Sequence, residues 1–319
     1  MGSLMSSDNQ ANTGKRQYSL SNQLKIWFLA LSLIPLCIGS WLSYNQAHTS
    51  RSEIIANELA YSSRLTARFT KNFFDSRFVE IKSQASNQSN IDLMKSLNMG
   101  LQLSGTTASD YVVSEDWTKR VDLKQDDLIR LTQYYSFIYD IFLIDNKGNI
   151  LLSVLKEEDI GSNLNHGVYA DTLFAKTYQN TVATNEVLFS DLERYAPSND
   201  LLSGFLTAPL LNAAGENVGV FAIQIDFRKV IKGMVAFSFS DTKHYLVGSD
   251  GLIRTNNKGN QDEILKRAIN TKQFESWQKN NSLNNTHKAH SDDYISSIIT
   301  YVGPDQVNVI GLHNTLPLH

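Results

Sequence analysis

The chain has a single cysteine among its 319 residues, Cys37, so it contains neither an intrachain disulfide nor a Cys-x-x-Cys metal or redox site. It also lacks runs of lysine and arginine, and its formal net charge of −3 at pH 7 offers no positive footprint for a nucleic-acid backbone. The seven histidines are scattered, without a Cys or Glu at a metal-ligand spacing. No GxSxG elbow and no phosphate loop are present. We therefore expect no cofactor, no metal, no nucleic-acid partner and no catalysis.

The chain does have enough apolar material for folded domains, since 42% of its residues are hydrophobic and 19% are charged. One stretch is far more apolar than this average. Residues 26–44, IWFLALSLIPLCIGSWLSY, carry no charge, and as a helix they reach about 29 Å, the thickness of a bilayer core. Pro35 lies in mid-stretch, which a membrane helix tolerates, and aromatic residues stand near both ends. This pattern predicts a spanning helix over residues 26–45.

The charges around this stretch predict its orientation. Three basic residues precede it within residues 15–25, whereas Arg51 is the nearest base after it. The positive-inside rule then places a tail over residues 1–25 in the cytoplasm and everything after about residue 46 outside. A cleaved signal peptide is the alternative, but the apolar stretch is longer than a usual h-region, and no clean small-x-small cleavage site follows it.

From Arg51 to about Ser86, apolar residues recur three or four positions apart without an intervening Gly or Pro. This pattern predicts one long amphipathic helix, which forms a stalk over residues 46–108 together with the turns after it. Its apolar face can pack on a following domain, on a second copy of itself or on both, and we expect a homodimer through this helix. Polar turns are predicted over residues 86–90 and 105–109, and further helix over residues 110–135. The apolar positions are Ile55, Leu59, Leu65, Phe69, Phe73 and Ile81, with Phe74 and Phe78 on an adjoining stripe.

Two distant segments repeat one pattern. FLIDNKGNIL at residues 142–151 and YLVGSDGLIR at residues 245–254 each give an apolar strand, a polar turn containing Gly and a second apolar strand. Aligning Gly148 with Gly251 brings their apolar positions into register. The repeat predicts an α+β protein with two consecutive antiparallel-sheet modules, over residues 109–235 and 236–319.

The first module is predicted to hold a five-stranded antiparallel sheet with helices against it, and the second a smaller sheet. The first has strands over residues 140–155 as a hairpin, then 187–190, 204–211 and 217–226, with helices over 169–180 and 227–235. The second has the hairpin 244–255, a helix over 263–280, a surface loop over 280–293 and strands over 294–301 and 306–314. The acidic run at residues 156–159 is interpreted as a solvated loop.

An anchor, a long helix and two small sheets in this order resemble the double Cache (dCache) extracytoplasmic sensor regions of bacterial transmembrane receptors. The resemblance covers about residues 50 to 319 and is carried by YDIFLIDNKGNILLSV, FSDLERYAPSNDLLSGFLTAPLL, GENVGVFAIQID, HYLVGSDGLIRT and YVGPDQVNVIGLHNTLPL. It implies two PAS-like modules: a membrane-distal one with the ligand pocket and a membrane-proximal one, here without its last strand. It also implies a bacterial inner-membrane receptor with a periplasmic sensor, and a cytoplasmic kinase, cyclase or chemoreceptor output that this chain does not contain.

Polar and aromatic side chains gather in the irregular connections of the first module, as a small-molecule pocket requires. A phenol offers a stacking surface and a hydroxyl, and a carboxylate accepts from an ammonium group, so Tyr169, Asp191 and Tyr195 are candidates for holding an amine or an amino acid. Each also has a structural alternative, a core position for the tyrosines and a turn cap for Asp191. The full candidate set adds Asp171, Arg194 and Ser198, with Trp117 and Arg120 closing the other side.

The amine- and amino-acid-binding subset of this family shows an Arg-x-Trp-Tyr cluster before the helix, with a Tyr and an Asp further on. Tyr169 and Asp191 match the later positions, but residues 165–168 are Asn, His, Gly and Val, so the Arg and the Trp are missing. The ligand class, an amine, an amino acid or an organic acid, therefore stays open. We predict a small-molecule sensor that passes helix motion across the membrane. The alternative is a membrane-anchored periplasmic protein-binding or scaffold module without a small-molecule ligand.

Overall fold

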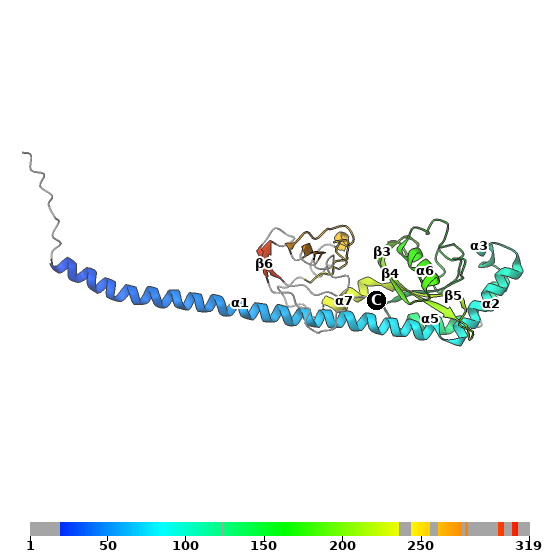
Figure 1. The fold of residues 1–319 in the computed structure, drawn as a ribbon, viewed down its shortest axis with the longest axis horizontal. Coiled ribbons are helices and arrows are strands. Elements are labelled where there is room, and N and C mark those ends of the chain that lie inside the picture. Colours follow the sequence, from blue (N-terminus) through cyan, green and yellow to red (C-terminus); the bar gives the residue numbers. More distant parts are fainter. Residues whose placement is uncertain are drawn as a thin grey trace, which may run out of the picture. The chain divides into compact units, whose positions relative to one another are not determined.

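The computed structural model describes residues 20–122, 124–235, 244–255, 261–272, 274–275, 278–279, 299–302 and 308–311. The chain divides into two units, Met1–Asn57 and Glu58–His319. Helix α1 (Leu20–Ala85) begins in the first unit and ends in the second. Figure 1 shows it as one continuous helix, followed by the shorter helices and the strands of the second unit.

Within the described residues, α1 is the one helix long and apolar enough to cross a membrane. Its most apolar 18-residue window has a mean hydropathy of 1.9, and none of that window is buried inside the protein. The aromatic side chains of Trp27, Trp41 and Tyr44 are exposed, as the prediction of a span over residues 26–45 requires. Length and composition thus agree with a spanning helix, and its orientation stays a prediction.

The part of α1 in the second unit packs one face against the sheet, as predicted from the spacing of its apolar residues. Phe74 and Ile81 are buried. The Phe74 ring lies 4.9 Å from that of Phe189, and the Phe73 ring lies 5.4 Å from that of Phe137. Ile55, at the other end of the predicted apolar face, is exposed. The predicted homodimer through α1 stays a prediction.

Four helices follow α1. They are α2 (Gln88–Ser104), α3 (Ala108–Tyr111), α4 (Glu115–Asp122) and α5 (Gln125–Tyr134). The Asn87 side chain caps α2 by accepting from Ser89 N, so the predicted turn over residues 86–90 is shorter than expected. Gly105, with a φ of +65°, ends α2 in the left-handed conformation that glycine adopts readily. The helix predicted over residues 110–135 is divided into three.

The predicted five-stranded antiparallel sheet is confirmed. Its strands are β1 (Ile138–Ile144), β2 (Ile150–Ser153), β3 (Leu188–Tyr195), β4 (Leu201–Leu211) and β5 (Asn217–Asp226), in the order β2-β1-β5-β4-β3. The short helix η1 (Ala196–Ser198) connects β3 to β4. Helix α7 (Phe227–Val235) follows β5, where a closing helix was expected.

The helix predicted over residues 169–180 lies further along the chain, as α6 (Leu173–Thr184). Thr172 is its N-cap, because its hydroxyl accepts from Ala175 N. Tyr169 and Asp171 therefore precede the helix instead of lying on it, which corrects their predicted position.

Both faces of the sheet are covered. Side chains of α1, α2, α4 and α5 form one buried cluster with one face, and α6 forms a second with the other (Figure 1). On β5 the alternation is direct: Phe221 and Ile223 belong to the first cluster, and Val220 and Ala222 to the second. The sheet is thus a central layer between two sets of helices.

In the second predicted module, the repeated hairpin is confirmed, since Val247 and Ile253 pair antiparallel. Strands β6 (Ile299–Val302) and β7 (Asn308–Gly311) also pair antiparallel, within the two strands predicted there. A short helix, η2 (Gln261–Glu263), precedes residues 264–271. The predicted loop over residues 280–293 lies outside the described residues. A complete second sheet, and the module boundary between residues 235 and 236, stay predictions.

The helix predicted over residues 263–280 is wrong for residues 264–271. Several of their backbone groups bond to the hairpin: Ile269 N donates to Gly251 O, and Leu265 N donates to Ile253 O. Lys266 N and Arg267 N donate to Glu263 O, which forms a single turn. An apolar spacing that suits a helix also suits a segment lying along a hairpin, and the tertiary pairing decides between them.

Arg254 of this hairpin joins it to β3. Its Nε and Nη2 donate to the two carboxylate oxygens of Asp191 at 2.9 and 2.8 Å, and Nη2 also contacts Asp250 at 2.9 Å. Only 10% of the Arg254 side chain is exposed. Asp191 lies where the β3–β4 register shifts, with a φ of +60°. Such a planar bidentate pair fixes the hairpin relative to the sheet edge.

Asp191→Asn tests this contact, because asparagine keeps the size and tolerates a positive φ but loses the charge. Since Asp191 is half exposed, we expect a modest loss of about 1 kcal/mol, equivalent to roughly fivefold faster hydrogen exchange of the amides of residues 252–254. Asp200→Asn is the matched control, since Asp200 also has a positive φ, of +55°, and is exposed. Equal exchange in the two variants would contradict the link.

Candidate functional site

The α6 face of the sheet changes from apolar to polar along its strands. On β5, Val220 and Ala222 are followed on this face by Gln224. The neighbouring strand β1 pairs Asp140 with Gln224, and both side chains are fully buried. Polar side chains from adjacent strands therefore meet at one end of an otherwise apolar face, where the connection after β2 packs against the sheet. Buried polar residues on an otherwise apolar sheet face are expected at functional sites.

We name the group at this end the acidic-aromatic cluster. Its members are the carboxylates Asp140, Glu157 and Asp159 and the phenols Tyr139, Tyr169 and Tyr195. Glu157 accepts from the Tyr139 hydroxyl at 2.7 Å and from the Ser198 hydroxyl at 2.6 Å. Gln224 Nε2 in turn donates to Ser198 Oγ at 3.0 Å. A connected network thus links β1, the connection after β2, η1 and β5.

Asp159 is the incompletely bonded member of the cluster. It is fully buried, and its Oδ2 accepts from the equally buried Tyr195 hydroxyl at 2.8 Å. Its Oδ1 is also buried and has no hydrogen-bond partner in the part of the chain that the structure describes. The Tyr169 and Tyr195 rings lie 6.2 Å apart. A buried carboxylate oxygen without a donor is costly, and its presence beside two phenol rings points to a missing partner.

Burial also shifts the protonation of this cluster. It raises the pKa of Asp159 to about 6, and the nearby Glu157 charge adds to this effect. The Tyr195 hydrogen bond and the backbone amides of Asp159 and Ile160 oppose it. Burial likewise raises the pKa of Asp140 to about 7, although Ser153 and two backbone amides donate to it. Among the described residues, no lysine, arginine or histidine bonds to any of the three carboxylates. The three carboxylates are therefore not paired with a basic side chain within the part of the chain that the structure describes.

This arrangement suits an organic cation. Carboxylates accept from an ammonium group, and phenol rings attract a cation to their faces. In the described ranges, no group of three His, Cys, Asp or Glu side chains is placed to hold a metal ion. The side chains of the cluster thus have the chemistry to accept from an ammonium group.

The eight residues predicted to bind a ligand fall into three places. Tyr169, Tyr195 and Ser198 come together in or beside the acidic-aromatic cluster. Asp191 instead pairs with Arg254, and Arg194 and Asp171 are exposed. For all of these residues a role in ligand binding stays a prediction.

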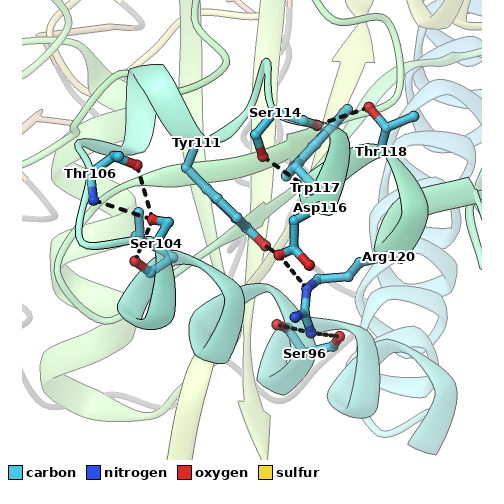
Figure 2. Close-up of polar contacts among 10 residues, drawn as sticks. Ser96, Ser104, Thr106, Tyr111, Ser114, Asp116, Trp117, Thr118 and Arg120 are labelled. Carbon is cyan, nitrogen blue, oxygen red and sulfur yellow. Dashed lines mark hydrogen bonds and ion pairs between the residues drawn. The ribbon is translucent and has the colours of Figure 1, made fainter.

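Trp117 and Arg120 lie together on α4, as Figure 2 shows. Trp117 is a buried core residue whose Nε1 donates to Leu151 O at 2.7 Å. Arg120 pairs with Asp116 at 2.7 Å. Neither side chain forms a hydrogen bond to the acidic-aromatic cluster within the described residues, and their predicted ligand role also stays a prediction.

Sequence reasoning missed Asp140, Asp159 and Gln224. The solvated-loop interpretation of residues 156–159 is wrong for Asp159, because this side chain turns inward to Tyr195. A usable signal existed for the other two, since Asp140 and Gln224 each interrupt an apolar strand. A polar residue within such a strand is expected to have a specific buried partner.

No family model matches the chain, and no curated protein matches it. Among solved structures, the sensor domain of the histidine kinase DctB from V. cholerae matches 82% of this chain and 92% of its own, with 12% identity and a TM-score of 0.50. The sensory domain of the Campylobacter jejuni chemoreceptor Tlp3 with isoleucine bound matches 79% of this chain and 85% of its own, with 13% identity and a TM-score of 0.46. The ligand-binding domain of the Pseudomonas aeruginosa chemoreceptor PctC in complex with GABA matches 69% of this chain and 88% of its own, with 12% identity and a TM-score of 0.45. The DctB match shows a shared sensor-domain fold, in agreement with the predicted resemblance.

Asp159→Asn measures the cost of the buried carboxylate. Because the pKa of Asp159 is raised from 3.8 to about 6, the folded protein binds more protons than the unfolded chain between these values. Stability contributed by Asp159 is thus present below about pH 4 and lost as the pH rises toward 7. The unfolding free energy of Asp159→Asn relative to wild type should rise by about 2–3 kcal/mol from pH 4 to pH 7.

Urea unfolding of the full chain at several pH values checks this, with exposed Asp171→Asn as the control. The asparagine also alters the Tyr195 hydrogen bond, but that change is independent of the Asp159 charge and shifts all points equally. If the difference in unfolding free energy between Asp159→Asn and wild type is the same at pH 4 and pH 7, Asp159 is not a buried titrating group.

Proposed function

We propose that this chain is the extracytoplasmic sensing region of a membrane-anchored signalling receptor, and that its acidic-aromatic cluster binds a small organic cation. The ligand class is a primary amine or the ammonium end of an amino acid. Three observations support this: the sensor-domain fold shared with DctB, the apolar part of α1, and the uncompensated charge of the cluster. The proposal includes a cytoplasmic N-terminus, a periplasmic location after about residue 46 and a homodimer through α1.

The unpartnered Oδ1 of Asp159 carries the ligand assignment. A buried ionised carboxylate with one open oxygen loses solvation without full compensation. An ammonium group bonded to Oδ1 would supply both the missing donor and the missing positive charge. Binding would then favour the ionised form of Asp159, so affinity for an amine should increase as the pH rises through about 6.

Strand β3 offers a route from the cluster to α1. Tyr195 at its end contacts Asp159, and Glu193 accepts from Leu173 N and Phe174 N at the start of α6. At the other end of the strand, Phe189 packs on Phe74 of α1. A ligand that binds one position of β3 better than another would shift the equilibrium between them, and only this difference in affinity supplies the energy.

A thermal-shift experiment on the full chain in detergent tests the ligand class. Ethanolamine, putrescine, GABA and single L-amino acids are the probes. We expect at least one to raise the unfolding midpoint by about 5 °C at a hundredfold excess over its dissociation constant, because it binds the folded state. Asp159→Asn should abolish this rise, whereas exposed Asp171→Asn should keep it.

Asp159→Asn is expected to fold, since it removes a buried charge instead of creating one. If no amine shifts the wild-type midpoint, or if the shift survives in Asp159→Asn, the cation site is refuted. If an uncharged or anionic compound binds and its binding depends on Asp159, the proposed ligand class is refuted, but the proposed location of the ligand site is supported.

Cysteine labelling tests the topology. In a Cys37→Ser background, Leu103→Cys introduces a thiol at an exposed position of α2, and Ser6→Cys introduces one before the apolar stretch. A membrane-impermeant maleimide applied to cells with a permeable outer membrane should label Leu103→Cys and leave Ser6→Cys unlabelled until the inner membrane is opened. Labelling in the reverse order would refute the proposed orientation.

A further inference from the structure

A cleft lies between α2 and α4, and none of its lining residues belongs to the acidic-aromatic cluster. It has a volume of about 290 Å³ and is lined by Leu93, Ser96, Lys119, Arg120 and Lys124. Three of these five side chains are cationic, and none is acidic. The volume suits a small molecule at the lower end of the usual range for ligand pockets.

Arg120 is held in place in this cleft before any ligand arrives. Its Nε donates to Asp116 Oδ2 at 2.7 Å, and its Nη1 donates to the Ser96 hydroxyl at 3.1 Å and to Ser96 O at 3.3 Å (Figure 2). The guanidinium therefore bridges α4 and α2, with 24% of the side chain still exposed. A fixed, partly exposed guanidinium loses little conformational entropy when it binds an anion.

Gly100 and Tyr111 make this position possible. A Cβ at Gly100 would overlap the Tyr111 hydroxyl and lie 2.8 Å from Arg120 Nε. The Tyr111 ring is fully buried and its hydroxyl faces the Asp116 carboxylate at 3.4 Å, as Figure 2 shows. A glycine within a helix costs about 1 kcal/mol relative to alanine, and here it makes room for the group that orients Asp116 and Arg120.

The lysines add positive charge that is weakly neutralised. Lys119 lies 3.4 Å from Glu115, but both side chains are largely exposed, and such a pair contributes little. Lys124, the residue before α5, forms no ion pair with another described residue. One fixed guanidinium and two mobile ammonium groups around a small cleft are suited to an anion with several oxygens.

We infer that the α2–α4 cleft is a binding site for a small oxyanion, a carboxylate or a phosphate group. Arg120 would contact the anion through the guanidinium edge that faces the cleft, and Lys119 and Lys124 would close over it. This site is independent of the proposed cation site, since the two share no residue. A membrane-anchored sensor with both would respond to two ligands of opposite charge.

Isothermal titration of the full chain in detergent, at constant low ionic strength, tests this with inorganic phosphate and with succinate. We expect saturable binding of at least one probe. Arg120→Gln should weaken it about tenfold and Lys124→Gln about threefold, whereas Arg130→Gln on the neighbouring helix α5 should leave it unchanged. Arg130 is a matched control, because it is an exposed arginine paired with Asp127 outside the cleft.

Phosphate binding without succinate binding assigns a phosphate group, and the reverse assigns a carboxylate. Arg120→Gln also removes bonds between α2 and α4, so two further variants separate the loss of the anion contact from the loss of these bonds. Lys124→Gln removes one positive charge of the cleft. Gly100→Ala displaces Tyr111 and Arg120 without removing a charge. A cooperative urea-unfolding transition serves as the folding control for every variant. No binding by wild type, or equal weakening by Arg130→Gln, would overturn the proposal.

Discussion

The register shift in β3 is the constraint on which the rest of the molecule depends. Side chains two positions apart on a regular strand share one face, so Phe189 and Tyr195 would lie on the same side. The shift between Phe189 and Leu192, with Asp191 at a φ of +60°, reverses this. Phe189 therefore packs with α1 on one face, while Tyr195 reaches the acidic-aromatic cluster on the other. The same irregularity presents Asp191 to Arg254. Bulges re-aim side chains next to functional sites, and here one bulge connects a buried site, a second hairpin and the long helix.

The buried carboxylates of the acidic-aromatic cluster lower the stability of an otherwise apolar, well-packed sheet face. Val220, Phe142 and Phe205 show that the α6 face can be filled with apolar side chains, and the same face ends in Asp140 and Asp159. Asp140 is compensated by three donors, so it orders the β1–β2 hairpin and the start of the next connection. Asp159 has one side-chain donor, Tyr195, and its Oδ1 has no hydrogen-bond partner among the described residues. The backbone amides of Asp159 and Ile160 also lower its pKa, but burial outweighs them, as it does at Asp140. We propose that a ligand supplies the partner of Oδ1.

The fold followed from local patterns, but much of the site did not. The α1 helix, the five strands and both hairpins have strong periodic signals, and the structure has them close to where the pattern placed them. Tyr169, Tyr195 and Ser198 were found because polar residues gathered in irregular segments. Asp159 could not be found in this way, because its polar neighbours in sequence suggest solvent, and its burial depends on Tyr195, 36 residues further on. The helix predicted over 263–280 failed over residues 264–271 for a related reason, since backbone groups of this segment pair with the hairpin.

Residues near each of the two proposed sites bond to the same strand, β5. Helix α2, one wall of the anion cleft, is fixed to β5 by Asn98, whose Nδ2 donates to Val218 O at 2.9 Å. Further along β5, Gln224 bonds to Ser198 and Ser203 in the network beside the acidic-aromatic cluster. A change in the position of β5 thus has a direct physical route to both sites, without passing through solvent or a flexible loop. Linkage makes any such coupling reciprocal: if an anion between α2 and α4 strengthens cation binding by some factor, the cation must strengthen anion binding by the same factor.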